Sequence, residues 1–223
     1  MTASTIARPF PSGSRLDHIA WAVPDTRVGV ADMVDRTGAQ IKLYDEPEAG
    51  QFYHSAALRF ADGQFLEILG PAPGVTGHPL TEYLRALPEG RLLFWYIRVD
   101  DWNRLEQAAT SLDRPLSWVE SVDDPRYHAY RRAGIGKDFD PAVPNAIRWD
   151  RRHVASDEDG VCRLAGFEVG HPDTGRLQRI HDELGTELVV AAADVPTLAL
   201  EFDAPNGRIR LEGIGNPMAG TDG

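Results

Sequence analysis

The chain has 223 residues, of which 42% are hydrophobic, and this is enough for one large or two small compact units. Its formal net charge of −11 at pH 7 disfavours nucleic acids and anionic membrane surfaces as partners. No apolar run reaches the length of a membrane span, and the single cysteine, Cys162, excludes a disulfide framework and a thiolate metal cluster. A reducing cytoplasm is therefore the expected compartment.

The first structured unit is predicted over residues 16–70, after a loose arm at 1–15 that lacks an apolar signal core. It opens with the apolar strand "LDHIAWAV". Asp25 is placed to cap an amphipathic helix that ends at Gly38. The segment "AALRFADGQFLEILG" then has the pattern of a hairpin that turns at Gly63. With a short strand after the helix, the order of elements is β-α-β-β-β.

The middle of the chain is less regular. Residues 71–91 are predicted to be a linker that contains a short helix. Residues 92–153 again begin with a strand, an Asp-Asp cap and a helix, and "NAIRWDRRH" is their candidate last strand. The stretch 120–144 is rich in Asp, Arg, Pro and Gly, and this composition predicts a long loop or lid.

The pattern of the first unit returns over residues 162–213. "LAGFEVGHPDTGRLQRIHDELGTEL" contains a strand, a Pro-Asp-Thr cap and an amphipathic helix, and "LALEFDAPNGRIRLEG" repeats the hairpin. The sequence therefore predicts a second βαβββ unit, followed by a frayed tail at 214–223. The predicted fold class is α+β, with repeated βαβββ modules and an irregular middle module.

A repeated βαβββ unit that opens with "LDHIAWAVPD" and closes with "FLEIL" resembles the vicinal-oxygen-chelate superfamily, in particular its glyoxalase-like branch. The resemblance covers roughly residues 15–213. It implies curved mixed sheets that form a cleft around a divalent metal, and it allows a homodimer. The superfamily includes isomerases, lyases, extradiol dioxygenases and metal-free drug-binding proteins, so the fold leaves the function open.

The resemblance also implies a set of metal ligands. The expected positions fall on His18 in the first strand, Glu67 in the last strand of the first unit and Glu212 in the last strand of the last unit. Counted back from the capping Asp, the counterpart of His18 is Phe94 in the middle unit and Gly166 in the last one. Neither can bind a metal through its side chain. One histidine and two carboxylates suit Mn²⁺, Fe²⁺, Mg²⁺ or Zn²⁺ without choosing among them.

Glu67 raises a question of its own, because it stands in the middle of an apolar strand. Phe65 and Leu69 share its face of the strand. An unpaired carboxylate is costly to bury, so Glu67 needs a cation beside it. The candidates are a bound metal and Arg59 on the neighbouring hairpin strand.

The other two expected ligands have alternatives as well. Strict alternation places His18 on one face with Leu16 and Ala20, where it is either a metal ligand or a hydrogen-bonded histidine of the sheet. Glu212 shares a strand face with Arg210, so a surface ion pair competes with its role as a ligand.

Aromatic and arginine side chains of the middle and last units are candidates for substrate binding. Arginine binds carboxylates through two parallel hydrogen bonds, so such residues suit an acidic substrate. The alternative is ordinary strand packing with solvated charges. The candidate residues are Tyr96, Arg98, Arg148, Trp149 and Arg210.

The function that these observations favour is a metal-dependent lyase or isomerase that acts on a small, vicinally oxygenated organic substrate. The metal would stabilise an enediolate-like state, with Glu67 or Glu212 as the base. Extradiol cleavage is less favoured, because the family pattern for it has two histidines and one carboxylate. The alternatives are a metal-free protein that binds a small molecule in the same cleft, and a scaffold whose site has decayed.

Overall fold

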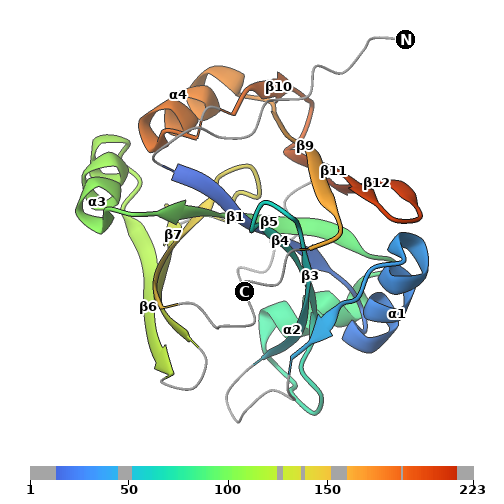
Figure 1. Ribbon diagram of the computed structural model, residues 1–223. Coiled ribbons are helices and arrows are strands. Elements are labelled where there is room, and N and C mark those ends of the chain that lie inside the picture. The colour runs from blue at the N-terminus through green and yellow to red at the C-terminus, as the bar shows by residue number, and fades with distance from the viewer. Residues whose placement is uncertain are drawn as a thin grey trace.

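The computed structural model describes residues 14–44, 52–124, 128–136, 139–151, 160–186 and 188–214. Over these ranges the fold is α+β, as predicted, with four helices and two mixed sheets of eight and four strands (Figure 1). None of the helices in these ranges combines the length and the apolar character that crossing a membrane requires.

The first unit has the predicted βαβββ order. Asp25 accepts a hydrogen bond from the backbone N–H of Val28 and caps the helix, and Gly38 ends it in the left-handed conformation at a φ of 69°. The elements are β1 (Ser14–Ala22), α1 (Thr26–Thr37), β2 (Lys42–Leu43), β3 (Tyr53–Arg59) and β4 (Phe65–Pro71).

The middle unit is more regular than predicted. After the linking helix α2 (Pro79–Ala86), it contains β5 (Arg91–Val99), α3 (Trp102–Ser111), β6 (Leu116–Asp124), β7 (His128–Ile135) and β8 (Asn145–Arg151). The predicted loop over 120–144 is therefore wrong for most of its length, because β6 and β7 form an antiparallel pair there. Its charged composition misled the prediction. Arg131 and Arg132 lie within strand β7, where Glu106 and Glu120 pair with them.

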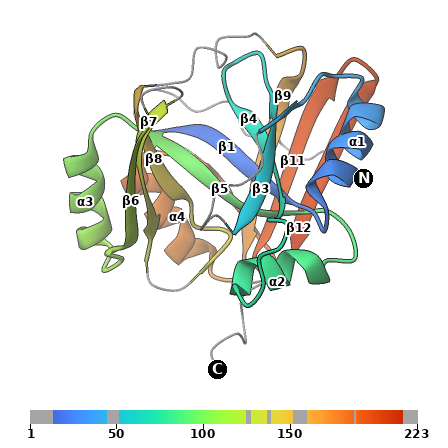
Figure 2. The ribbon, with the colours of Figure 1, turned by 90° about the horizontal axis from the view of Figure 1, so that it is seen from below.

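The first and middle units together build the eight-stranded sheet, in the order β2-β3-β4-β1-β5-β8-β7-β6. Strands β1 and β5 run antiparallel at its centre, and each pairs in parallel with the last strand of its own unit. The sheet curves strongly, so that β6 and β7 form one side and β3 the other (Figures 1 and 2). It is thus the middle unit, and not the last one, that faces the first across the concave side.

The last unit forms a sheet of its own. Its elements are β9 (Arg163–His171), α4 (Thr174–Leu184), β10 (Val190–Ala192), β11 (Thr197–Ala204) and β12 (Gly207–Ile214). They have the predicted order along the chain, but the sheet order is β10-β9-β11-β12. In the first unit the last strand, β4, lies beside the first, whereas here β12 is at the edge. The last unit therefore does not repeat the pairing of the other two.

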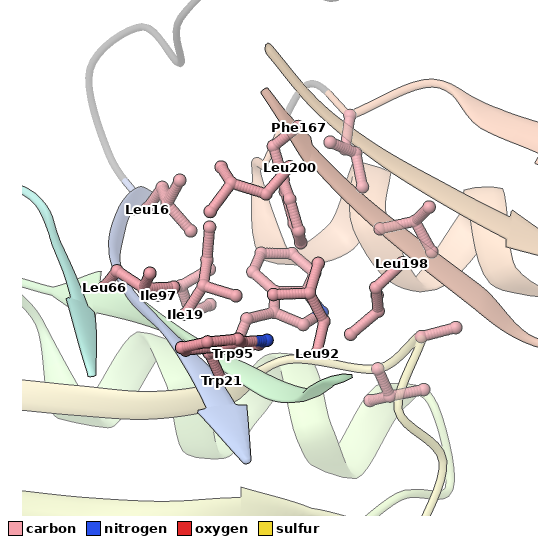
Figure 3. Close-up of a cluster of buried hydrophobic side chains, with 14 of the residues drawn as sticks. Leu16, Ile19, Trp21, Leu66, Leu92, Trp95, Ile97, Phe167, Leu198 and Leu200 are labelled. Atoms are coloured by element: carbon pink, nitrogen blue, oxygen red, sulfur yellow. The ribbon is translucent and has the colours of Figure 1, made fainter. Parts of the chain in front are cut away.

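The main hydrophobic core lies between the two sheets. Figure 3 shows Trp95 and Ile19 of the central strands beside Phe167 and Leu200 of the last unit. Trp95 is fully buried, and its ring meets Phe167 edge-on with the ring centroids 5.1 Å apart. The last unit thus covers one face of β1 and β5. Tyr96, between the core residues Trp95 and Ile97, points to the opposite, concave side.

A buried histidine joins this core. His181 of α4 is fully buried, lies parallel to the Trp95 ring at 5.6 Å, and has its Nδ1 atom 2.9 Å from Oγ1 of Thr186. Burial lowers its pKa from an ordinary 6.5 to about 4, despite the opposing effect of the Ala142 backbone and Asp182. The folded state therefore holds this imidazole neutral in a pH range where the unfolded chain protonates it.

We expect the free energy of unfolding to fall as the pH drops from about 6.5 to about 4, because only the unfolded chain takes up this proton there. The loss amounts to about 3 kcal/mol at the acid end. Urea unfolding at a series of pH values measures it. His181→Asn should flatten the dependence, whereas His171→Asn, at a partly exposed site, should keep it. An unchanged slope in His181→Asn would contradict the assignment.

Candidate functional site

The site begins with an irregularity in β1. Leu16 pairs with Ile97 and His18 pairs with Tyr96, so Asp17 is an extra residue in β1, as in a β-bulge. The bulge breaks the strict alternation of the strand. Leu16 therefore lies in the core with Ile19 (Figure 3). Asp17 and His18 are in contact with each other. The prediction that Leu16 shares a face with His18 is wrong for this reason.

Asp17 is a fully buried carboxylate that receives three side-chain hydrogen bonds. His18 Nδ1 lies 2.9 Å from Oδ1, and Oδ2 accepts from Arg98 Nε at 2.9 Å and from Trp149 Nε1 at 3.0 Å. Burial alone would raise the pKa of Asp17, but the hydrogen bond and charge of His18, and then those of Arg98, hold it below its usual value. Asp17 therefore stays ionised and links β1, β5 and β8.

The ionised state of Asp17 determines how His18 is protonated. An ionised carboxylate only accepts hydrogen bonds, so Nδ1 of His18 carries a proton whether the ring is charged or neutral. In the neutral ring, Nε2 therefore has the lone pair. The ring is held in place by stacking between Phe65, at 4.6 Å, and Tyr96, at 4.3 Å, its partners on the two neighbouring strands. The imidazole ring of His18 is thus fixed in position and orientation.

Glu67 lies opposite the free nitrogen of His18. Its Oε2 atom is 3.8 Å from His18 Nε2, and its side chain is 16% exposed. This distance is too long for a direct hydrogen bond, so an atom of a third group can interact with both. Arg59 lies over the ring of Phe65 instead, and it makes no ion pair with Glu67 among the residues that the structure describes.

The two sides of the curved sheet meet above His18 and Glu67. Tyr53 of β3 accepts a hydrogen bond from Arg132 of β7 at 3.3 Å. Arg132 also donates to Glu120 and packs over the ring of Tyr130, which meets Trp149 edge-on. Among the described residues, aromatic rings therefore lie around the guanidinium group of Arg132 on the concave side.

The phenol groups of this lining remain protonated. Burial raises the pKa of Tyr53 and Tyr96, and it raises that of Tyr130 to about 12. The charge of Glu67 raises all three further, and the charge of Arg132 opposes it. At neutral pH these hydroxyl groups can therefore donate hydrogen bonds to a bound anion.

A polar cavity of about 370 Å³ lies where β5 and β8 end. Pairing between these strands is limited to Tyr96–Arg98 with Asn145–Ile147. Arg98 and Trp149, which hold Asp17, line the cavity together with Arg148. The structure thus brings these three predicted substrate-binding residues together.

Residues 16–185 match the family model of the glyoxalase-like domain. The chain belongs to this glyoxalase-like family and, with it, to the vicinal-oxygen-chelate superfamily. The predicted resemblance is therefore confirmed. A search of curated protein sequences found no match.

Three solved structures are similar to this chain at low sequence identity. A hypothetical protein from Staphylococcus aureus is 10% identical with a TM-score of 0.52, covering 89% of this chain and 84% of its own. A mutant of 4-hydroxymandelate synthase from Streptomyces coelicolor is 12% identical with a TM-score of 0.51, covering 93% and 64%. Methylmalonyl-CoA epimerase from Mycobacterium tuberculosis is 16% identical with a TM-score of 0.44, covering 67% and 91%. At these identities the likeness to the first two concerns the fold alone.

Two predicted site residues lie elsewhere in this glyoxalase-like chain. Glu212 and Arg210 are exposed on β12 of the second sheet, where Arg210 donates to Glu212 at 2.8 Å and also binds Glu201. The expected set of His18, Glu67 and Glu212 is therefore not assembled, because the last unit pairs its strands differently and stays out of the concave face.

The side chains that could act as metal ligands decide whether the predicted metal centre fits this structure. Counted back from the caps Asp25 and Asp101, Phe94 corresponds to His18, and strand register makes Asn145 the counterpart of Glu67. Within the described ranges, no three His, Cys, Asp or Glu side chains gather as metal ligands would. A zinc site normally takes three or four protein ligands, and the predicted centre required three. The residues present therefore do not fit the predicted centre.

Some residues of the site were missed at the sequence level. Asp17 stands next to His18, and alternation would send its side chain to the opposite face, so only the bulge reveals it. Arg132 and Tyr130 were missed because their strand was predicted to be a loop. Tyr53 carried no signal beyond its position in the segment before the hairpin.

We expect Asp17→Asn to lower the free energy of unfolding by about 3 kcal/mol, because it leaves Arg98 and His18 without their buried partner. The difference in free energy of unfolding between the wild type and this variant should be full at neutral pH. It should vanish in strong acid, where Asp17 becomes protonated below its usual pKa range. Urea unfolding measures both effects. Asp150→Asn, at an exposed pair with Arg148, is the control and should cost less than about 1 kcal/mol. Equal losses in both variants would contradict a special role for Asp17.

Proposed function

We propose that this glyoxalase-like protein is an isomerase or lyase that moves a proton on a small oxygenated organic substrate, with His18 and Glu67 as its acid–base pair. The observation that carries the proposal is the separation of 3.8 Å between His18 Nε2 and Glu67 Oε2, with Nδ1 of the same ring held by Asp17. Two bases that face each other without a direct hydrogen bond can share one substrate carbon.

The proposed chemistry is the transfer of one proton within the substrate. One group of the pair takes the proton of a substrate C–H next to a carbonyl group, and that same proton, directly or after passing to the other group, is delivered to the adjacent atom or to a leaving group. Asp17 is a positioning residue. It holds the imidazole ring and stabilises the imidazolium ion that forms when Nε2 accepts a proton. No step passes through a metal, because the residues that the structure describes do not assemble the predicted centre.

The aromatic lining supports a second candidate, which is the binding and sequestration of a small molecule without turnover. Phe65 and Tyr96 enclose His18, and the rings of Tyr130 and Trp149 continue this surface. Such a lining favours flat ligands. Sequestration would not need an oriented histidine opposite a carboxylate, so the acid–base proposal accounts for more of the site.

We expect the wild-type protein to catalyse exchange of carbon-bound hydrogen for deuterium in a panel of 2-oxo acids and 2-hydroxy ketones in D₂O, followed by proton NMR. His18→Gln and Glu67→Gln should each slow this exchange by roughly 10²-fold or more, because each removes one partner of the proton transfer. His171→Gln, which alters a histidine of the last unit, is the matched control and should leave the rate unchanged.

Two results would contradict the proposal. Binding of panel compounds without any exchange would favour sequestration. Loss of exchange after dialysis against a chelator, with recovery on addition of Mn²⁺, Fe²⁺ or Zn²⁺, would show that a metal takes part after all. Metal analysis of wild type and Glu67→Ala by mass spectrometry checks the second result directly.

A further inference from the structure

Arg132 is a charged group on the concave side to which the proton-transfer proposal assigns no role. Its side chain is 21% exposed and belongs to β7, opposite Glu120 on the neighbouring strand. Nε donates to Glu120, and Nη1 donates to the hydroxyl group of Tyr53. A guanidinium group has five N–H donors, so three of them have no acceptor among the described residues.

The surroundings of Arg132 fix the direction in which it presents these donors. Its guanidinium group lies 5.5 Å from the ring centroid of Tyr130 and 5.8 Å from that of Trp118. Glu120 holds one end of the guanidinium group and Tyr53 reaches it from the other side of the curved sheet. A side chain restrained in this way loses little conformational freedom when it binds a ligand.

The charges on the concave side are arranged with opposite signs. The charge of Arg132 lowers the pKa of three phenol groups, and the charge of Glu67 raises it. These groups belong to Tyr53, Tyr96 and Tyr130. The tyrosines therefore lie within the field of a cation from β7 and of an anion from β4. A ligand that spans this space meets bases at one end, and a cation with protonated phenols at the other.

We propose that Arg132, together with the hydroxyl group of Tyr53, is the binding site for the carboxylate group of the substrate, so that the substrate is a small organic acid. Arginine binds carboxylates with paired, charge-assisted hydrogen bonds, and a phenol hydroxyl can add a third. The identification of this acid as a substrate rests on the proposed proton transfer at His18 and Glu67. The anion site itself rests on Arg132 and the tyrosines.

The test measures binding of benzoylformate, which carries an aromatic ring, a ketone and a carboxylate but has no exchangeable α-hydrogen. Benzoylformamide is the neutral counterpart of the same shape. By calorimetry, the wild-type protein should bind the acid at least tenfold more tightly than the amide. Arg132→Gln should remove this preference, and Tyr53→Phe should weaken binding of the acid by a smaller factor.

Arg131→Gln is the matched control. Arg131 precedes Arg132 on the same strand but lies over the ring of Trp102, 4.4 Å from its centroid, and pairs with Glu106 of α3. Its loss should leave the preference for the acid unchanged. Equal affinity of the wild type for acid and amide would overturn the proposal, and this result does not depend on the folding of any variant. An Arg132→Gln protein that melts like the wild type and still prefers the acid would overturn it too.

The design separates this inference from the proton-transfer proposal. Glu67→Gln should abolish deuterium exchange but keep or strengthen benzoylformate binding, because it removes a negative charge from the site. If the wild type prefers the acid but exchanges no hydrogen, the acid–base proposal fails and the anion site stands. If exchange occurs and the acid and the amide bind equally, Arg132 does not bind the carboxylate group of the substrate.

Discussion

The antiparallel pairing of β1 with β5 is the constraint on which the rest of the molecule depends. It joins the first and middle units into one curved sheet and gives the two faces of these strands opposite tasks. One face packs Trp95 against Phe167 of the last unit and is closed to solvent. The other carries His18 and Tyr96 toward the concave side. Core and site are thus two sides of the same pair of strands.

The extra residue in β1, Asp17, decides on which side of the strand its carboxylate lies. Without it, Asp17 would point into the apolar core, where an ionised carboxylate costs several kcal/mol. With it, the carboxylate turns toward Arg98, Trp149 and His18, and the hydrogen bonds from these three side chains compensate for its burial. The same contacts orient the imidazole. A local departure from regular strand geometry therefore supplies both a buried charge network and a positioned imidazole ring.

This chain combines the glyoxalase-like scaffold with an asymmetric pair of units. The middle unit has Phe94 and Asn145 where the first unit has His18 and Glu67, and it contributes Arg132 and Tyr130 instead. His18 and Glu67 of the first unit thus face a cation and phenol groups of the middle unit. The last unit, whose strands pair in another order, adds stability to the far face and leaves its charged residues Arg210 and Glu212 in solvent.

The sequence by itself determined the strands of the first and last units, the capped helices, the α+β class, the family and the candidates His18 and Glu67, because caps, turns and apolar periodicity are local signals. It did not reveal which units pair, since strand pairing depends on contacts between residues far apart in the chain. Only the tertiary structure decided that Glu212 lies outside the site and that Arg132 and Tyr53 lie within it. The bulge at Asp17 was also decided by the tertiary structure, because the register between β1 and β5 creates it and neither strand encodes it alone.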